Sequence, residues 1–475
     1  MSRSAPKPVA GGRRSGLHEG KPWSFDRLSP LDASNLRVEK HGLPMNIAAL
    51  AILQGTPLVD PAGQFALETA RETIERRLHL TPRLRQVLFV PRLGLGPPLW
   101  IDDPRFDIRE HVRVQAISAP GDEASLVREC ARLNEPPFDR SRPLWEMWFL
   151  TGLADGAIAL LIRVHHVVAD GLAALAMFGA FFDPQPRAES PQAQPWIPRS
   201  KPGSPALLAD NMLRRVAAVT GGFTRLAHPR SLPGGLAVRS RQLRQVLREG
   251  RAPRVSFNQP VGKHHRMMLV RADLERVKTA AHAHGAKVND VVLAAVAGGA
   301  RALLASRGEL TPGLVLKASV AASIRALSTA NAPGNLVGIL LVPVPVGEPD
   351  PIRRLEQIAR ATAERKQIPP YQPSARIAQR WMVRTMSHQR LVNLGASNLP
   401  GPPVPLYFAG AKILQLFQAG VIQGNVTLTV GVLSYAGQLN FDIVGDVQAV
   451  PDLAVFAEGV TEELKTLTQA TPEKR

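Results

Sequence analysis

The sequence predicts an α/β protein divided into two lobes. Its 475 residues exceed the length of one ordinary domain and leave ample material for two cores. In both halves, short apolar runs alternate with segments whose apolar residues recur at helical spacing. Between the halves, residues 183–260 are rich in Pro, Gly, Ser and Arg, a composition typical of an interdomain connection. We therefore expect four regions: a disordered basic tail at residues 1–24, an N-terminal lobe at 25–182, the linker at 183–260 and a C-terminal lobe at 261–475.

In the N-terminal lobe, apolar spacing predicts both strands and helices. Helices are expected at residues 65–80 and 122–133, and strands at 47–53, 144–150 and 157–164. The last two strands are separated by Asp155-Gly156, a dipeptide that favours a hairpin. Within the linker, residues 207–226 are expected to form an amphipathic helix.

The C-terminal lobe restarts the mixed pattern. Strands are expected at residues 266–270, 316–321, 337–344, 426–435 and 438–444, and helices at 274–284, 291–305, 350–366 and 452–467. The longest apolar run, residues 336–346, contains Pro343 and Pro345 and is too short to span a bilayer. Any membrane association is therefore expected to be peripheral.

The most informative stretch is residues 157–178. A buried strand is expected to end near Val164, after which come His165 and His166, and Asp170-Gly171 then begins a helix. Neighbouring side chains of a strand point to opposite faces, so the two histidines cannot both enter one cleft. We expect one ring to be available for chemistry and the other to support the corner. Asp170 is a favoured N-cap residue, and Gly171 allows close backbone approach at the turn.

A histidine suits the removal of a proton from a hydroxyl near neutral pH, because its ordinary pKa is about 6.5. An arbitrary pair of histidines is more often a satisfied core residue beside an ordinary helix cap. Here the spacing His165-His166-x-x-x-Asp170-Gly171 favours chemistry, because it matches the HHxxxDG signature of coenzyme A-dependent acyltransferases.

Further segments resemble the bacterial wax ester synthase/diacylglycerol acyltransferase family, including the actinobacterial triacylglycerol synthases. In chain order they are Leu28-Ser29-Pro30-Leu31-Asp32-Ala33-Ser34, Pro143-Leu144-Trp145-Glu146, Val288-Asn289-Asp290-Val291-Val292 and Ser397-Asn398-Leu399-Pro400-Gly401-Pro402. Each short motif alone is weak, but their shared order and spacing are specific.

This resemblance implies two chloramphenicol acetyltransferase-like lobes, each with a mixed sheet and helices, and a channel between them. It also implies transfer of a fatty acyl group from acyl-coenzyme A, used as co-substrate without a bound cofactor, to diacylglycerol or a long-chain alcohol. His166 corresponds to the general base, and His165 and Asp170 support it, with Arg325 as the candidate partner of Asp170. Asn289 is a candidate for oxyanion stabilisation or substrate positioning, although a plain N-cap explains it equally well.

The net charge of +19 restricts the partners. A positive surface suits the phosphates of coenzyme A, an anionic membrane or nucleic acid, but no nucleic-acid-binding motif is present. The basic linker helix could lie on anionic headgroups or be an ordinary solvated linker. A single cysteine, Cys130, and the lack of an apolar leader favour a cytoplasmic protein that is peripheral on the inner membrane face or on lipid droplets.

Other chemistries are disfavoured by the sequence. It contains no Gly-x-Ser-x-Gly elbow, the usual setting of a serine nucleophile. It also contains no His-Glu-x-x-His motif or cysteine cluster, so no metal is assigned. His264-His265 lacks a following Asp-Gly and is expected at the surface. Two alternatives remain open: the same fold acylating another hydroxyl, such as a polyketide-type acceptor, and a non-catalytic basic protein that coats a lipid surface. The intact motif argues against the second.

Overall fold

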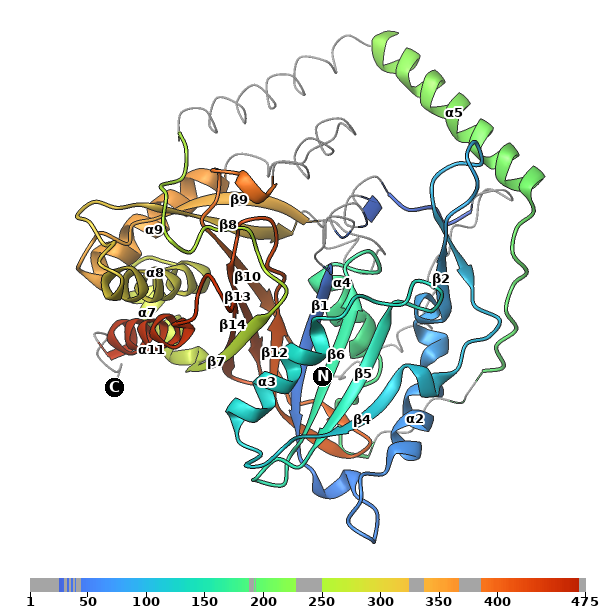
Figure 1. The fold of residues 1–475 in the computed structure, drawn as a ribbon, viewed down its shortest axis with the longest axis horizontal. Helices are drawn as coiled ribbons and strands as arrows, with labels where there is room; N and C mark the ends of the chain where they lie inside the picture. Colours follow the sequence, from blue (N-terminus) through green and yellow to red (C-terminus); the bar gives the residue numbers. More distant parts are fainter. Residues whose placement is uncertain are drawn as a thin grey trace, which may run out of the picture.

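The computed structural model describes residues 25–29, 32, 33, 36, 39, 44–187, 192, 194–227, 250–323, 337–366 and 386–469. Within these residues the chain forms two six-stranded sheets, a two-stranded ribbon and the helices that pack on them (Figure 1). The predicted α/β fold class is confirmed. The expected tail at residues 1–24 and the candidate Arg325 lie outside the described residues.

The first sheet contains the strand that ends at the histidine pair. In spatial order its strands are β11 (Tyr407–Phe408), β12 (Ala411–Ala419), β1 (Asn46–Leu53), β6 (Ile158–His165), β5 (Trp145–Thr151) and β4 (Val112–Ala116). β6 is buried along its whole length and is antiparallel to both β1 and β5, so the predicted hairpin is confirmed. Burial on both faces explains why β6 is a continuous apolar run up to Arg163 and His165 and not an alternating one.

Helices cover both faces of the first sheet. α2 (Leu67–Glu75) and α4 (Gly171–Gly179) contribute to the hydrophobic cluster on one face, and α3 (Glu123–Asn134) contributes to the cluster on the other. The predicted helix at 65–80 was too long, because α2 ends at Glu75. Directly after it, the Arg77 side chain is 3% exposed and pairs with Asp183 at 2.7 Å. Turning Arg77 inward takes the chain out of the helix, and the spacing of apolar residues cannot signal that.

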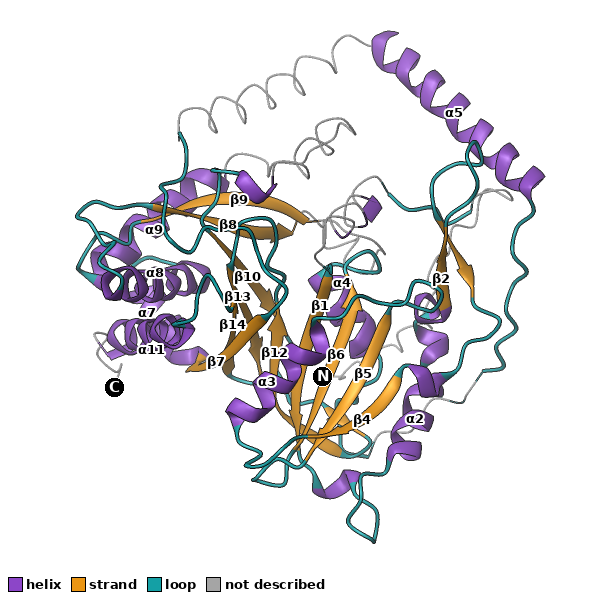
Figure 2. Cartoon of the chain, viewed as in Figure 1, coloured by secondary structure: helices purple, strands orange, loops and turns teal. Residues whose placement is uncertain are grey.

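The second sheet lies in the C-terminal half. Its strands, in spatial order, are β7 (His265–Asp273), β14 (Gln438–Asp446), β13 (Leu428–Tyr435), β10 (Leu394–Pro400), β8 (Leu316–Ser323) and β9 (Val337–Val344). Figure 2 shows the helices of this half on the side of the sheet that faces away from the first sheet: α7 (Leu274–Ala283), α8 (Val288–Ser306), α9 (Pro351–Lys366) and α11 (Leu453–Gln469). The predicted elements of this half are confirmed with ends shifted by at most three residues, while β10, β11 and β12 were not predicted.

The two sheets do not follow the sequence boundary at residue 261. β12 belongs to the C-terminal half but pairs along β1 and thereby extends the first sheet. Near its end, Gln418 donates from Nε2 to the carbonyls of Ser397 at 3.0 Å and Val432 at 2.6 Å, both in the second sheet. A Cβ added at Gly431 would lie 2.7 Å from the carbonyl oxygen of Gln418, so the glycine permits this close approach. The lobes are joined through this strand.

α8 is the central helix of the second lobe. A Cβ at Gly298 would lie 2.5 Å from Cβ of Glu463, and one at Gly299 would lie 2.7 Å from the carbonyl oxygen of Phe456. These glycines let α8 pack closely on α11. Among the described residues, α8 is the helix that is long and apolar enough to cross a membrane, but 72% of its apolar window is buried inside the fold. That burial is what a core helix of this length shows.

The linker contains the predicted amphipathic helix, observed as α5 (Ser204–Ala227). Its first turns are fixed to the N-terminal lobe. Asp210 accepts a hydrogen bond from Nε of Arg27 at 2.5 Å, and Asn211 donates to the carbonyl of Gly94 at 2.7 Å. Gly94 lies between β2 (Gln86–Phe89) and β3 (Leu99–Asp102), so α5 is held against the loop of that ribbon (Figure 1).

Candidate active site

The end of β6 forms a tight corner that leads into α4. His165 is the last residue of the strand, and the backbone N–H of His166 donates to the carbonyl of Met45 at 2.7 Å. The chain then turns, with the N–H of Val168 donating to the carbonyl of His165 at 2.9 Å. The β-branched residues before the corner suit the strand, and the small apolar residues after Gly171 suit the helix.

His165 is the buried ring of the pair, with 1% of its surface exposed. Its Nδ1 accepts a hydrogen bond from the backbone N–H of Val167 at 2.9 Å, so its proton is on Nε2. Nε2 lies 3.2 Å from a carboxylate oxygen of Glu39 and donates to it. Both nitrogens are therefore occupied, as expected for the supporting histidine.

Glu39 is the carboxylate that fixes this ring. Burial alone would raise the pKa of Glu39, but hydrogen bonds from His165 and Arg140 outweigh it, so the pKa lies below its ordinary value. Glu39 is thus ionised near neutral pH and holds the Nε2 proton of His165 in place.

His166 is the partly exposed ring of the pair. It follows the last paired residue of the strand, so its side chain does not enter the cluster that buries His165. The residue that the sequence assigns as the base is therefore half-buried. A fully buried ring would have excluded that role.

Asp170 and Gly171 set the geometry of the corner. Asp170 is fully buried and caps α4, accepting a hydrogen bond from the N–H of Ala173 at 2.9 Å. A Cβ at Gly171 would lie 2.9 Å from Cδ1 of Leu399, at the end of β10. A larger residue here would have to displace the end of the Leu399 side chain, so glycine eases the approach of the corner to the second sheet. The structure brings together the HHxxxDG corner and the Ser397-to-Pro402 segment, which are far apart in sequence.

Asn289 lies at the start of α8 (Val288–Ser306), in the C-terminal half. It is the second residue of α8, and the N-cap is Lys287, which differs from the expected N-cap at Asn289 or Asp290. The capping carboxylate comes instead from Asp290, which accepts a hydrogen bond from the N–H of Lys287 at 2.9 Å. α8 packs on the face of the second sheet that is turned away from the first sheet. The role of Asn289 in oxyanion stabilisation or substrate positioning therefore stays a prediction.

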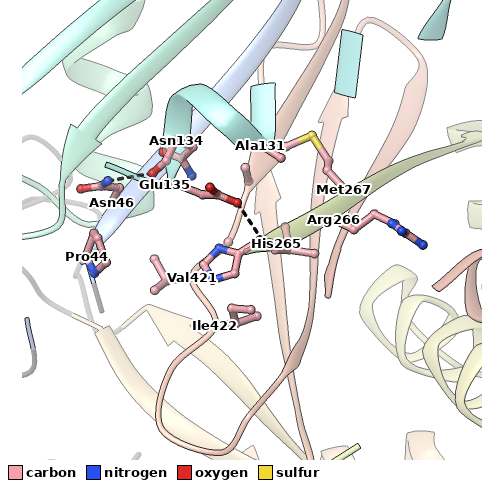
Figure 3. Close-up of a pocket in the computed structure, with 13 residues that line it drawn as sticks. Pro44, Asn46, Ala131, Asn134, Glu135, His265, Arg266, Met267, Val421 and Ile422 are labelled. Carbon is pink, nitrogen blue, oxygen red and sulfur yellow. Dashed lines mark hydrogen bonds between the residues drawn. The ribbon is translucent and has the colours of Figure 1, made fainter. Parts of the chain in front are cut away.

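A pocket lies between the lobes, close to this corner (Figure 3). Its cavity volume is about 30 Å³, so it is small. Its walls come from the start of β1, the end of α3, the start of β7, the end of β12 and the residues after it: Pro44, Asn46, Ala131, Asn134, Glu135, His265, Arg266, Met267, Ala419, Gly420, Val421, Ile422 and Val444. Asn46 stands directly opposite His165 in the β1–β6 pairing, so the pocket and the corner share a wall.

His265 was wrongly expected at the surface. The side chain of His264 is 76% exposed, but the ring of His265 is largely buried and lines the pocket. The reason is the parity of β7: successive residues of a strand face opposite sides, and His265 faces the interlobe seam.

Comparison with known families shows which family the chain belongs to. The profile of the wax ester synthase/diacylglycerol acyltransferase catalytic domain matches residues 28–292, and that of the WS/DGAT C-terminal domain matches residues 333–468. The chain belongs to the wax ester synthase/diacylglycerol acyltransferase family. It is therefore an acyltransferase, and the corner after β6 carries the family's HHxxxDG motif.

Individual relatives agree with this. A putative diacylglycerol O-acyltransferase of Mycobacterium tuberculosis is 31% identical over 95% of this chain and 92% of its own length. A probable diacylglycerol O-acyltransferase of the same species is 29% identical over 95% and 97%. The wax ester synthase/diacylglycerol acyltransferase of Marinobacter aquaeolei VT8 has the same fold, with a TM-score of 0.67 and 23% identity over 94% of this chain and 99% of that one.

A more distant structure shares the two-lobed fold. The starter condensation domain of rhizomide synthetase, solved in complex with C8-CoA, has a TM-score of 0.61 and 15% identity over 94% of this chain and 96% of that domain. The fold predicted from the family resemblance is therefore confirmed.

Sequence reasoning missed three residues around the WS/DGAT corner: Glu39, Leu399 and Gln418. Glu39 contacts His165 across 126 positions of sequence, and no local pattern marks it. Leu399 lies within a motif that had been singled out, but its contact with Gly171 depends on how the lobes dock. Gln418 shares β12 with two other polar residues, Lys412 and Gln415, so its polarity alone did not mark it for a specific hydrogen bond.

Proposed function

We propose that this WS/DGAT protein transfers a fatty acyl group from acyl-coenzyme A to the hydroxyl of diacylglycerol, and also to long-chain alcohols. The observation that supports this most is the division of labour in the histidine pair. His165 is buried with both nitrogens occupied, while the neighbouring ring of His166 is partly exposed at the same corner.

In the proposed reaction, His166 removes the proton of the acceptor hydroxyl as its oxygen attacks the thioester carbonyl. The tetrahedral intermediate then collapses, the carbon–sulfur bond breaks, and the proton passes from the imidazolium to the departing thiolate. The products are the ester and free coenzyme A. No covalent acyl-enzyme is required when donor and acceptor are held together beside one base.

The test is an acceptor panel with purified protein and palmitoyl-coenzyme A. Release of free coenzyme A is followed with diolein, hexadecanol, a polyketide-type secondary alcohol and no acceptor. We expect release with diolein and a smaller rate with hexadecanol, accompanied by triacylglycerol and wax ester. Release with the polyketide-type alcohol alone would favour the alternative acceptor class, and no release with any of them would contradict the proposed function.

The protein is further proposed to act on an anionic membrane face or a lipid droplet on the cytoplasmic side. Four exposed residues support this by forming one apolar stripe on α5: Leu208 (42% exposed), Met212 (50%), Val216 (59%) and Val219 (57%). The polar residues Asp210 and Asn211 face the protein instead. The stripe therefore points outward, in a chain with a net charge of +19 that favours anionic headgroups.

Flotation with vesicles tests this surface. The triple variant Met212→Ser, Val216→Ser, Val219→Ser should bind vesicles of anionic lipid roughly tenfold or more weakly than the unmodified protein. The reason is that three apolar side chains proposed to enter the lipid are replaced by polar ones. Leu80→Ser, which changes a residue of similar exposure (52%) outside α5, is the matched control. Equal binding of the triple variant and the control would remove α5 as the membrane contact.

A further inference from the structure

The β2–β3 ribbon ends in a turn that presents a leucine to solvent. The N–H of Leu95 donates to the carbonyl of Arg92 at 3.1 Å, which closes a four-residue turn with Leu93 and Gly94 at its centre. Gly94 has a φ of 92°, the left-handed backbone that the second central residue of a type II turn needs. The side chain of Leu93, at the first central position, is fully exposed. The turn therefore holds a large apolar side chain away from the rest of the protein.

Hydrogen bonds on the inner side of the ribbon hold this tip in place. Asn211 of α5 donates to the carbonyl of Gly94 at 2.7 Å. Arg27, whose side chain is 1% exposed, donates to the carbonyl of Pro97 at 2.7 Å. The exposure of Leu93 is therefore that of an anchored turn and not that of a loose loop.

The tip lies beside the apolar stripe of α5. Successive residues of a helix are rotated by about 100°, so Asn211 lies about 60° from Leu208 around the helix axis. Asn211 is therefore at the border between the buried side of α5 and the stripe. Because Asn211 holds Gly94, the turn is placed next to the Leu208 end of the stripe (Figure 1). Val90, which directly follows β2, adds a second exposed apolar side chain to the ribbon.

The charges around this surface are positive. Arg92 in the turn and Arg215 in α5 are both exposed. Residues 86–99 contain no acid, and the one acid of residues 204–227 is Asp210, which is buried in an ion pair. The ribbon tip and α5 thus combine exposed apolar side chains with cations and present no exposed carboxylate. This combination is complementary to anionic headgroups above an acyl layer.

A single exposed leucine is common on protein surfaces and needs no explanation by itself. Leu93 differs because its turn is anchored and lies next to a second exposed apolar surface. We propose that the tip of the β2–β3 ribbon enters an anionic lipid surface together with α5, with Leu93 as the inserted side chain. The proposal rests on the proposed membrane contact of α5 and adds a second element to it.

A second point of insertion has a physical consequence for the reaction. One helix lying on a lipid surface can roll about its axis, whereas a helix and a ribbon tip that enter at separate points fix the orientation of the N-terminal lobe. The diacylglycerol acceptor of the proposed reaction resides in such a surface. The ribbon therefore determines which side of the lobe faces the lipid that contains the acceptor.

The test places an environment-sensitive fluorophore at the tip. Leu93→Cys can be labelled selectively, because the other cysteine, Cys130, is fully buried and burial raises the pKa of its thiol. On vesicles of phosphatidylglycerol, the emission should shift to shorter wavelength and should be quenched by lipids that carry a nitroxide on the acyl chain. The same label on Leu80→Cys, at a 52% exposed position outside the ribbon and α5, should show neither change.

Flotation with the same vesicles measures how much the tip contributes. Leu93→Ser should bind about five- to tenfold more weakly than the unmodified protein, because one leucine fewer is transferred into apolar surroundings. Leu93→Phe keeps a large apolar side chain and should retain binding. Arg92→Gln should bind phosphatidylglycerol vesicles about fivefold more weakly and phosphatidylcholine vesicles equally well.

Unshifted emission at position 93 on vesicles that the unmodified protein binds would overturn the inserted tip. Equal binding by Leu93→Ser and the unmodified protein would overturn it as well. An emission shift that grows with protein concentration in the absence of vesicles would also do so, because a second copy of the chain would then cover the tip. Failure of the proposed membrane contact looks different: the unmodified protein would not float with vesicles, and both proposals would fall.

Discussion

The two histidine pairs of this chain occupy comparable places and differ in what their inner rings contact. His165-His166 follows β6, and His264-His265 opens β7. In each pair one residue is more buried than its neighbour: His165 is buried beside a half-buried His166, and His265 is half-buried beside an exposed His264. The inner ring of the first pair has a partner on both nitrogens, whereas Nε2 of the inner ring of the second pair has none among the described residues.

This difference shows that a dipeptide does not define a site. At the first pair, the corner capped by Asp170 holds the outer ring at the proposed reaction centre, and the inner ring is a rigid support. At the second pair, the outer ring is an ordinary surface residue and the inner ring is the one with unused hydrogen-bonding capacity. Burial and fold context, and not the residue type, distinguish the two rings of each pair.

The largest effect is expected when His166 is replaced by alanine and compared with the same replacement of His264. His166→Ala should lower kcat by on the order of 10²-fold or more, because it removes the general base. His264→Ala, at the equivalent outer position, should leave kcat unchanged. Coenzyme A release, with thermal unfolding to confirm the fold, measures both. Normal turnover by His166→Ala would eliminate the distinction drawn between the pairs.

A second effect is expected at the contact between Gly171, in the corner after β6, and Leu399 of the second sheet. Gly171→Ala places a methyl group 2.9 Å from Cδ1 of Leu399, which can move away, and should lower the free energy of unfolding by about 1 kcal/mol. Gly179→Ala, at the other end of α4, meets nothing within 4 Å and should be neutral or slightly stabilising. Urea unfolding distinguishes them. Recovery of stability in Gly171→Ala with Leu399→Ala would show that the contact itself is responsible.

A buried carboxylate without a hydrogen-bond partner among the described residues is found at Asp442. Its side chain is fully buried in β14, and neither carboxylate oxygen has a partner among the described residues. Burial raises the pKa of Asp442 well above its ordinary value, and the thiol of Cys130 on α3 faces it. The group is therefore neutral in the folded protein over a pH range in which it ionises in the unfolded chain.

Asp442→Asn should therefore stabilise the protein increasingly as pH rises. Because the folded pKa is the higher one, unfolding releases a proton, and stability falls as pH increases above the ordinary Asp value of about 3.9. Urea unfolding should show the Asn variant about 1–2 kcal/mol more stable at pH 8 and equal to the unmodified protein below pH ~4. A difference that does not depend on pH would mean that Asp442 is not buried as a neutral acid.

The smallest effect is expected at Glu39, the carboxylate that accepts a hydrogen bond from His165. Its pKa is lowered in the fold, so its contribution to stability is present above the ordinary Glu value of about 4.3 and is lost as pH falls through the folded value. Glu39→Gln should cost on the order of 1 kcal/mol or less at pH 7, and the cost should diminish in acid. Arg140→Ala, measured in parallel, separates the contribution of the cation that pairs with Glu39.

The residues that the sequence identified were those whose role is encoded locally. The order strand, His165-His166, Asp170 cap and helix follows from β-branched residues, an N-cap residue and helical spacing over about twenty positions, and the structure has each of them. The strands of the second sheet other than β10, and the helices α7, α8, α9 and α11, were predicted for the same reason.

Only the tertiary structure decided what these elements touch. The pairing of β12 with β1, the approach of Leu399 to Gly171 and the contact of Glu39 with His165 join residues more than a hundred positions apart. Periodicity specifies which side of an element is buried, but not which distant element covers it. The local structure of the corner can therefore be predicted from the sequence. Its contacts with the second lobe, and the pocket beside it, form only when the two sheets pack together.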